Sequence, residues 1–273
     1  MMKLPVAVQV YSVRDEAAKN FQATMQKIKD MGYQGVELAG MYGLPPEEIR
    51  RILDLIGLVA ISAHVPIQEL LADVDGTIAR YATVGCSYIA IPYLGDDMRP
   101  GTPGFLDIVA AIPNIGRKCR ANGITLLYHN HDFEFARMAD GEYALDYLYR
   151  TIPADLLQTE LDTCWVNVAG ESPSAYIRKY ANRCPVIHFK DFYMDGRGKG
   201  GKLYELIGIA EDKTERNSSF EFRPVGHGLQ DVPDLLKAAE ESGARWIVVE
   251  QDQSVGRTPL EAIEMSIKYL RSL

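Results

Sequence analysis

The sequence predicts an α/β protein in which one (β/α)8 barrel spans residues 1–273. Short apolar runs alternate eight times with longer segments of helical periodicity, which is the pattern of parallel strands joined by crossover helices. A doubly wound open sheet uses the same alternation but rarely reaches eight evenly spaced units. A single closed TIM barrel is therefore favoured, and its usual length of about 250 residues agrees with this chain.

The predicted strands are short buried runs whose polar residues gather at the strand ends. In chain order they cover residues 6–13, 35–38, 58–63, 88–92, 125–130, 157–162, 186–190 and 246–250. Because the carboxyl ends of barrel strands share one rim, we expect the polar residues at those ends to meet there.

Eight helical patterns follow the strands, at residues 21–31, 45–55, 68–83, 106–121, 143–151, 174–180, 232–241 and 259–270. Gly32, Gly57 and Gly85 each stand just past one of them, where a left-handed C-terminal cap needs glycine. Residues 195–228, after the seventh strand, form an irregular insertion that contains the sequence GRGKGG. The insertion is expected to be either a mobile lid or a small protrusion used in packing.

Composition and charge exclude several classes of partner. The chain has 29 Lys and Arg against 37 Asp and Glu, a formal charge of −8, without a basic run, so no nucleic-acid partner is expected. No stretch approaches the roughly 18 apolar residues of a membrane span, and the N-terminus is too polar for a signal peptide. Four cysteines without a CxxC pair indicate reduced thiols, and we expect a cytoplasmic protein.

The five histidines lie at or just beyond predicted strand ends, or in the loop before the last strand; they are His64, His129, His131, His188 and His227. In a barrel these positions converge on the mouth where the active site of this fold lies. A single histidine is as readily a structural residue, but five at one rim favour a functional site.

Carboxylates occupy the same strand ends, namely Glu37, Glu160, Asp162 and Glu250. An acidic side chain inside a barrel is costly unless it is paired or binds a cation. Imidazole together with carboxylate suits one divalent metal ion, with Mn, Zn, Co, Fe and Mg all open. The alternative is that these acids form salt bridges with Lys190, Arg223 or Arg14.

The strings QVYSVRD, GYQGVELAG, SAHVP, YHNHDFEF, ELDTCWVNVAG, VIHFKDF, PVGHG and VVEQD run through nearly the whole chain. Together they resemble the sugar phosphate isomerase/epimerase family of xylose isomerase-like barrels, which shares ancestry with the endonuclease IV type of DNA repair enzyme. The resemblance implies a metal held by Asp162, His188 and Glu250. The fourth ligand of the family, a Glu on strand five, is replaced here by His129.

The same resemblance implies that the strand-five and strand-eight glutamates transfer protons, so Glu250 is retained and its partner is missing. We expect His129 to bind the metal while His131, Glu134 or Glu160 supplies the second acid/base group. The alternative is that His129 is the base and Glu160 reaches the metal.

Further residues near the predicted mouth are expected to bind substrate: Glu37, His64, Tyr93, Trp165, Lys190 and His227. Trp165 stands where the endonuclease branch has a second metal-binding His, which argues against a nuclease. Core packing of Trp165 is as plausible as sugar stacking. Lys190 and Asp191 resemble the family's Lys-Asp pair, and we expect them to bind substrate hydroxyls.

These features predict a metal-dependent sugar or polyol isomerase or epimerase, which moves a proton next to a carbonyl through an enediolate. One alternative is a lyase or dehydratase of the same barrel family, acting on an inosose or a 3-keto-glycoside. A second is a sugar-binding barrel without catalysis. The expected partner is a small sugar or polyol, and a homodimer is possible.

Overall fold

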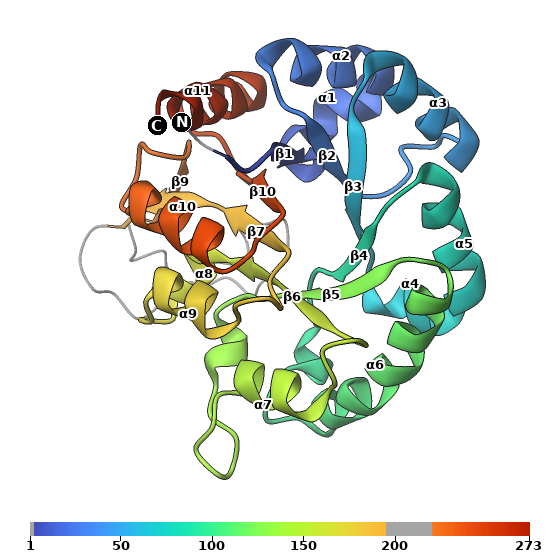
Figure 1. The fold of residues 1–273 in the computed structure, drawn as a ribbon, viewed down its shortest axis with the longest axis vertical. Coiled ribbons are helices and arrows are strands. Elements are labelled where there is room, and N and C mark those ends of the chain that lie inside the picture. Colours follow the sequence, from blue (N-terminus) through green and yellow to red (C-terminus); the bar gives the residue numbers. More distant parts are fainter. Residues whose placement is uncertain (1–2, 195–219) are drawn as a thin grey trace.

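The computed structural model describes residues 3–194 and 220–273. Eight parallel strands close into one barrel, in the order β1-β10-β7-β6-β5-β4-β3-β2 (Figure 1). The strands are β1 (Val6–Gln9), β2 (Gly35–Leu38), β3 (Val59–His64), β4 (Tyr88–Ile91), β5 (Thr125–His129), β6 (Gln158–Asp162), β7 (Val186–Phe189) and β10 (Trp246–Val249). The predicted fold class is thereby confirmed.

Helices surround the barrel on its outside (Figure 1). They are α1 (Arg14–Lys19), α2 (Phe21–Met31), α3 (Pro46–Ile56), α4 (Ile67–Ala72), α5 (Val74–Val84), α6 (Pro103–Ala121), α7 (Ala144–Thr151), α8 (Thr163–Val168), α9 (Pro173–Lys179), α10 (Val232–Glu241) and α11 (Pro259–Ser272). None of those in the described part of the chain is long and apolar enough to cross a membrane.

Two predicted elements are shorter than expected because a side chain caps the backbone. The first strand ends at Gln9, whose side chain accepts a hydrogen bond from the Tyr11 backbone and starts a 3-10 turn at Val10–Val13. The helix expected at residues 68–83 is divided at Asp73, whose carboxylate accepts from the Gly76 backbone and caps α5. Both breaks use local side-chain bonds that hydrophobic periodicity does not register.

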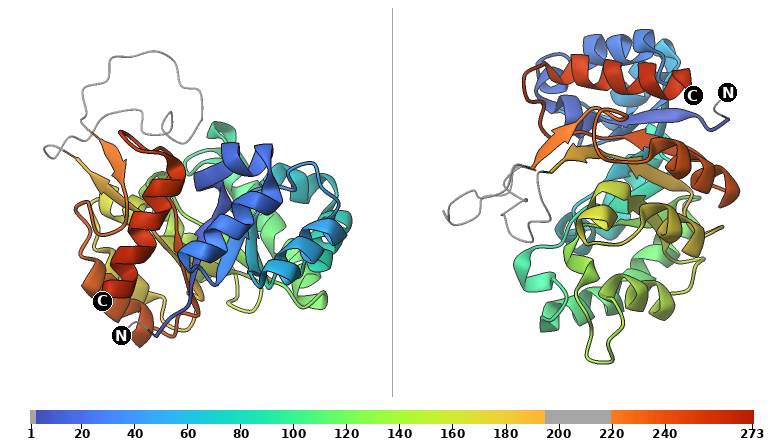
Figure 2. Two further views of the ribbon diagram at one scale, coloured as in Figure 1. Left: turned by 90° about the horizontal axis from the view of Figure 1, so that it is seen from above. Right: turned by 90° about the vertical axis from the view of Figure 1, so that its left-hand side faces the viewer.

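The expected insertion at 195–228 is only partly described, since residues 195–219, with GRGKGG, lie outside the described residues. Its last part is not irregular as expected, because β9 (Glu221–Arg223) pairs antiparallel with β8 (Asp191–Tyr193). This two-stranded ribbon follows β7 directly, and Figure 2 shows it at the end of the barrel where the strands finish.

Asp191 anchors the turn that follows β9. Its Oδ2 accepts from the backbone N–H groups of Gly226 (2.9 Å) and Gly228 (3.0 Å), and its Oδ1 accepts from that of Gln230 (3.1 Å). A Cβ on Gly228 would lie 2.2 Å from Asp191 Oδ1, so this close approach requires glycine. Asp191 is thus occupied by backbone bonds, and its expected contact with substrate hydroxyls is not supported.

The amino-terminal half of the barrel interior is filled by an apolar plug, which we define as Ala7, Ile61, Tyr88, Ala90, Leu127, Val186, Trp246 and Val248. All but Trp246 are buried. Such layers of inward side chains make the barrel a packed core and not a pore. The plug leaves the carboxyl-terminal end of the barrel interior for buried polar side chains.

Candidate active site

Strand alternation places a polar layer directly above the apolar plug. Side chains two positions apart on a strand point the same way, so His129, His188 and Glu250 follow plug residues on β5, β7 and β10. On β6 the inward positions are Glu160 and Asp162. All five side chains are buried, between 0% and 4% exposed.

Four of these residues form a ligand quartet, defined as His129, Asp162, His188 and Glu250. Their ligand atoms all lie within 4.8 Å of one another, so the group could hold a metal ion. This is the set that the sequence predicted. Asp162 supports the fit, because its buried Oδ2 has no hydrogen-bond partner among the described residues. Two carboxylates with two imidazoles suit Mn²⁺, Fe²⁺, Co²⁺ or Zn²⁺.

A second set of possible ligands overlaps the quartet and contains His64, His129, Glu160 and His188. His129 belongs to both sets, since its Nδ1 is 3.2 Å from Glu160 Oε1 and its Nε2 is 3.6 Å from Asp162 Oδ2. The alternative in which Glu160 reaches the cation is therefore also geometrically open. Which residue replaces the strand-five Glu stays a prediction.

Glu37 lies beneath the ligand quartet and does not line the cavity. Its carboxylate accepts from Gln9 Nε2 at 2.7 Å and from the Ser62 hydroxyl, and its Oε1 is 2.7 Å from His188 Nε2. A carboxylate on the far side of a metal-binding histidine orients the ring. The structure thus places Glu37 behind His188 and not at the substrate surface that the sequence predicted.

Lys190 brings a buried positive charge to the quartet. Its Nζ lies 2.5 Å from Asp252 Oδ2 and 3.1 Å from Glu250 Oε2. Burial alone would lower the pKa of Lys190, but Asp252, Glu250 and Asp162 outweigh it and raise the pKa well above its usual value. Sequence reasoning missed Asp252, although its position two residues after Glu250 was a usable signal.

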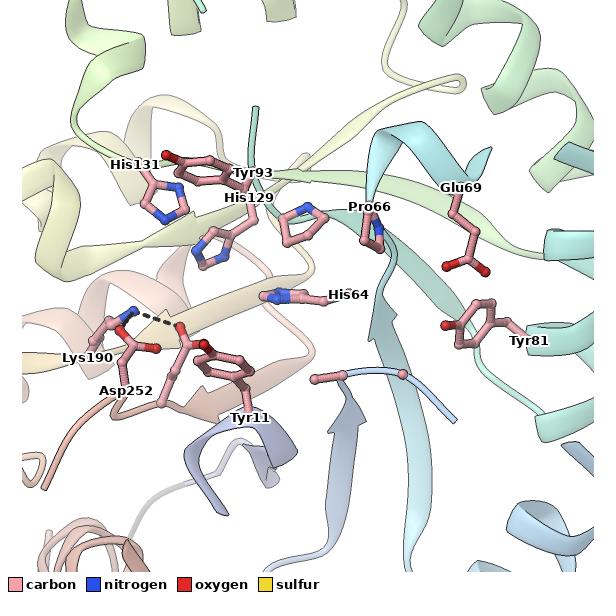
Figure 3. Close-up of a pocket in the computed structure, with 14 residues that line it drawn as sticks. Tyr11, His64, Pro66, Glu69, Tyr81, Tyr93, His129, His131, Lys190 and Asp252 are labelled. Carbon is pink, nitrogen blue, oxygen red and sulfur yellow. Dashed lines mark hydrogen bonds and ion pairs between the residues drawn. The ribbon is translucent and has the colours of Figure 1, made fainter. Parts of the chain in front are cut away.

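A cavity of about 410 Å³ opens beside the quartet (Figure 3). Its lining residues are Tyr11, Ala39, Gly40, His64, Pro66, Glu69, Tyr81, Pro92, Tyr93, His129, His131, Lys190, Glu250 and Asp252. Its size is that of a small-molecule site. Three predicted substrate-binding residues, His64, Tyr93 and Lys190, are among them.

The predicted catalytic residues separate into two groups. Glu250 and His131 line the cavity, whereas Glu160 and Glu134 are fully buried and do not. Glu134 accepts from the Tyr128 hydroxyl (2.6 Å) and from the His131 backbone N–H (2.8 Å), which fixes the loop that carries His131. Burial raises the pKa of Glu134 to about 8.

Two histidines of the overlapping ligand sets, His64 and His129, have pKa values shifted in opposite directions. Burial would lower the pKa of His64, but Glu37 and Glu160 outweigh burial and raise it to about 10. Burial lowers the pKa of His129 to about 4 despite its contact with Glu160. The cluster can therefore hold a protonated imidazole next to a neutral one.

Two predicted substrate-binding residues lie away from the cavity surface. Trp165 is fully buried and packs against Phe220 and Phe222, with ring centroids 6.4 and 6.1 Å away. His227 is exposed, and its ring lies 6.2 Å from that of Tyr269 on α11. The expectation that all five histidines lie at the barrel mouth is therefore wrong for His227, because the turn after β9 places it next to α11. The other four lie at the mouth as expected.

Comparisons with known proteins agree with this architecture. The sequence profile of the family described as "Xylose isomerase-like TIM barrel" matches residues 25–273. A protein of Lacticaseibacillus casei named inosose dehydratase is 24% identical over 277 residues, covering 92% of this chain and 88% of that protein.

Two solved structures show the same fold. A sugar phosphate isomerase/epimerase of Parabacteroides distasonis has a TM-score of 0.78 at 21% identity, covering 99% of both chains. The 3-keto-D-glucoside 4-epimerase YcjR of E. coli has a TM-score of 0.68 at 15% identity, covering 99% of this chain and 100% of that one. At these identities the likeness concerns the fold alone.

Proposed function

Because the chain belongs to the xylose isomerase-like TIM barrel family, we propose that it is a metal-dependent lyase that removes water from an inosose, a cyclic polyol ketone. The sequence alone favoured an isomerase or epimerase and held the lyase as its alternative. The relatives named inosose dehydratase match most of both lengths and support that alternative better.

The reaction breaks a C–H bond next to the ketone and the C–O bond of the hydroxyl on the following carbon. A base takes the proton, an acid protonates the departing hydroxyl, and water leaves as the carbon–carbon double bond forms. A divalent cation at the ligand quartet would polarise the ketone and stabilise the negative charge of the transition state.

The observation that carries the proposal is that Glu250 and His131 line one cavity beside the ligand quartet. They lie far apart in the sequence, just after β10 and just after β5, and supply a carboxylate and an imidazole for proton transfer. The Nζ of Lys190 lies 3.1 Å from Oε2 of Glu250 and compensates the negative charge of that carboxylate.

The replacement at strand five favours elimination over epimerisation. Epimerisation returns a proton to the opposite face of the same carbon, and the family resemblance assigns this task to two glutamates. Here His129 stands in place of one of them. Elimination can use a single base that takes the proton from carbon and then gives it to the leaving hydroxyl, and Glu250 and His131 are the two candidates for that base.

The test uses protein stripped with chelator and then reloaded with one equivalent of Mn²⁺ or Zn²⁺. A panel of inososes is incubated in deuterated water and followed by NMR. We expect loss of water from one inosose, only in the reloaded protein. Deuterium incorporation without water loss would instead support an isomerase or epimerase. Binding of an inosose without either change would indicate a sugar-binding barrel without catalysis.

A further inference from the structure

We propose that the end of the cavity remote from the ligand quartet is a second subsite, which binds a neutral sugar ring attached to the ketone substrate. This distal lobe is defined by Ala39, Gly40, Pro66, Glu69 and Tyr81. The inference rests on the proposed function and makes the preferred substrate a glycosylated inosose.

The distal lobe lies across the barrel from the catalytic groups. Its residues follow β2 and β3 or belong to α4 and α5, whereas the quartet stands on β5, β6, β7 and β10. Figure 3 shows Glu69 and Tyr81 at one side, His131 and Lys190 at the other, and His64 between them. One continuous cavity joins the two ends.

A single ring bound at the ligand quartet does not extend to the residues of the distal lobe. Eight strands about 4.8 Å apart and tilted by about 36° put the strand backbones on opposite sides of the barrel roughly 15 Å apart, and Glu69 and Tyr81 lie on helices outside that wall. A six-membered ring with its hydroxyl oxygens spans about 6 Å, given covalent bonds near 1.5 Å. A ketone ring bound at the quartet therefore leaves the distal lobe for another group.

The polar groups of the distal lobe suit hydroxyls. The side chain of Tyr81 is 2% exposed, its hydroxyl end turns toward the cavity, and that hydroxyl has no hydrogen bond to any described residue. Glu69 Oε1 accepts from Arg80 at 2.6 Å, which leaves Oε2 as an acceptor. Phenol and carboxylate oxygens beside the apolar ring of Pro66 are typical of a site that fixes a polyol.

The charge of the distal lobe decides against an ionic substituent. The Glu69 carboxylate is compensated by Arg80, so the pair carries no net charge and would attract neither an amine nor a phosphate strongly. A neutral hydroxylated ring fits best. Two hydrogen bonds, one to the Tyr81 hydroxyl and one to the Glu69 carboxylate, correspond to a preference of at least about tenfold.

The experiment compares an inosose with the same inosose carrying an O-linked glucose, using the metal-loaded full chain. We expect kcat/KM for dehydration to be about tenfold higher for the glucosyl compound. In Tyr81→Phe and in Glu69→Ala, this ratio should fall about threefold to fivefold, since each removes one hydrogen-bonding group. The matched control Tyr147→Phe, on α7, should keep the wild-type ratio.

A wild-type ratio of one or below, or a ratio that neither variant changes, would overturn the subsite. If neither compound loses water, the proposed function fails instead, and the subsite is then judged by calorimetry with inositol and glucosyl-inositol. Tighter binding of glucosyl-inositol, weakened in Tyr81→Phe, supports it; equal affinities refute it.

Discussion

The two ends of the barrel interior use the same strands for opposite purposes. At the amino-terminal end the inward side chains form the apolar plug, whereas two positions further on they become the ligand quartet and its neighbours. The plug excludes water and contributes stability through burial. The polar layer buries charges that cost free energy unless they are paired or hold a cation. The residues that stabilise the barrel and those expected to carry the chemistry thus lie two positions apart on the same strands.

The largest expected effect is at the polar end, in Asp162→Asn. Turnover should fall by at least about 100-fold, because the carboxylate that is proposed to bind the metal becomes a neutral amide. The amide oxygen can still accept from the backbone of Cys164 and Trp165, so α8 keeps its N-cap. Turnover and bound metal per chain are the measurements, with the exposed Asp155→Asn as control; full activity in Asp162→Asn would remove the quartet from the mechanism.

The apolar end should respond in stability and not in chemistry. Leu127→Ala, at a fully buried side chain of the plug, should lower the free energy of unfolding by about 2–5 kcal/mol. Leu106→Ala, at a side chain that is 49% exposed, should change it by less than about 0.5 kcal/mol. Denaturant unfolding measures both. A loss of metal affinity in folded Leu127→Ala would show that the two ends are not separate.

A smaller effect concerns Glu134, which is buried at the polar end. Its pKa in the folded protein, about 8, lies above its ordinary value near 4.5. The folded state therefore keeps a proton that the unfolded state loses, so this group's contribution to stability falls from pH 4.5 to 8 and is lost above pH 8.

In Glu134→Gln the decline of stability between pH 5 and 8 should be shallower, by up to about 1.4 kcal/mol per pH unit. Urea unfolding at several pH values tests this, and the more exposed Glu264→Gln should keep the wild-type slope. Parallel slopes in all three proteins would show that Glu134 is ionised in the folded state.

The smallest effect concerns the cysteine thiols, which belong neither to the apolar plug nor to the ligand quartet. All four cysteines are buried, and burial raises the pKa of Cys86, Cys119 and Cys184 to about 12. Reaction needs the thiolate, so a chromogenic disulfide at pH 8 should modify less than about one thiol per chain before unfolding and four after it. Rapid modification of the native protein would contradict this burial.

Periodicity predicted most of the barrel because strands and helices bury faces with different repeats. It failed where a polar side chain bonds to the nearby backbone, as Gln9 does at the end of β1 and Asp73 does at the start of α5. The pairing of β8 with β9 was also missed, since two strands of three residues carry too little pattern.

What the sequence determined by itself was the alternation that closes the barrel and the residue types that end each strand, including the quartet. Tertiary structure decided which polar residues face the cavity: Glu37 and Glu134 lie behind it, His227 lies apart, and Asp252 joins it. The physical reason is that strand order and alternation are local properties of the chain. The partner of a buried charge depends on segments that meet only after folding.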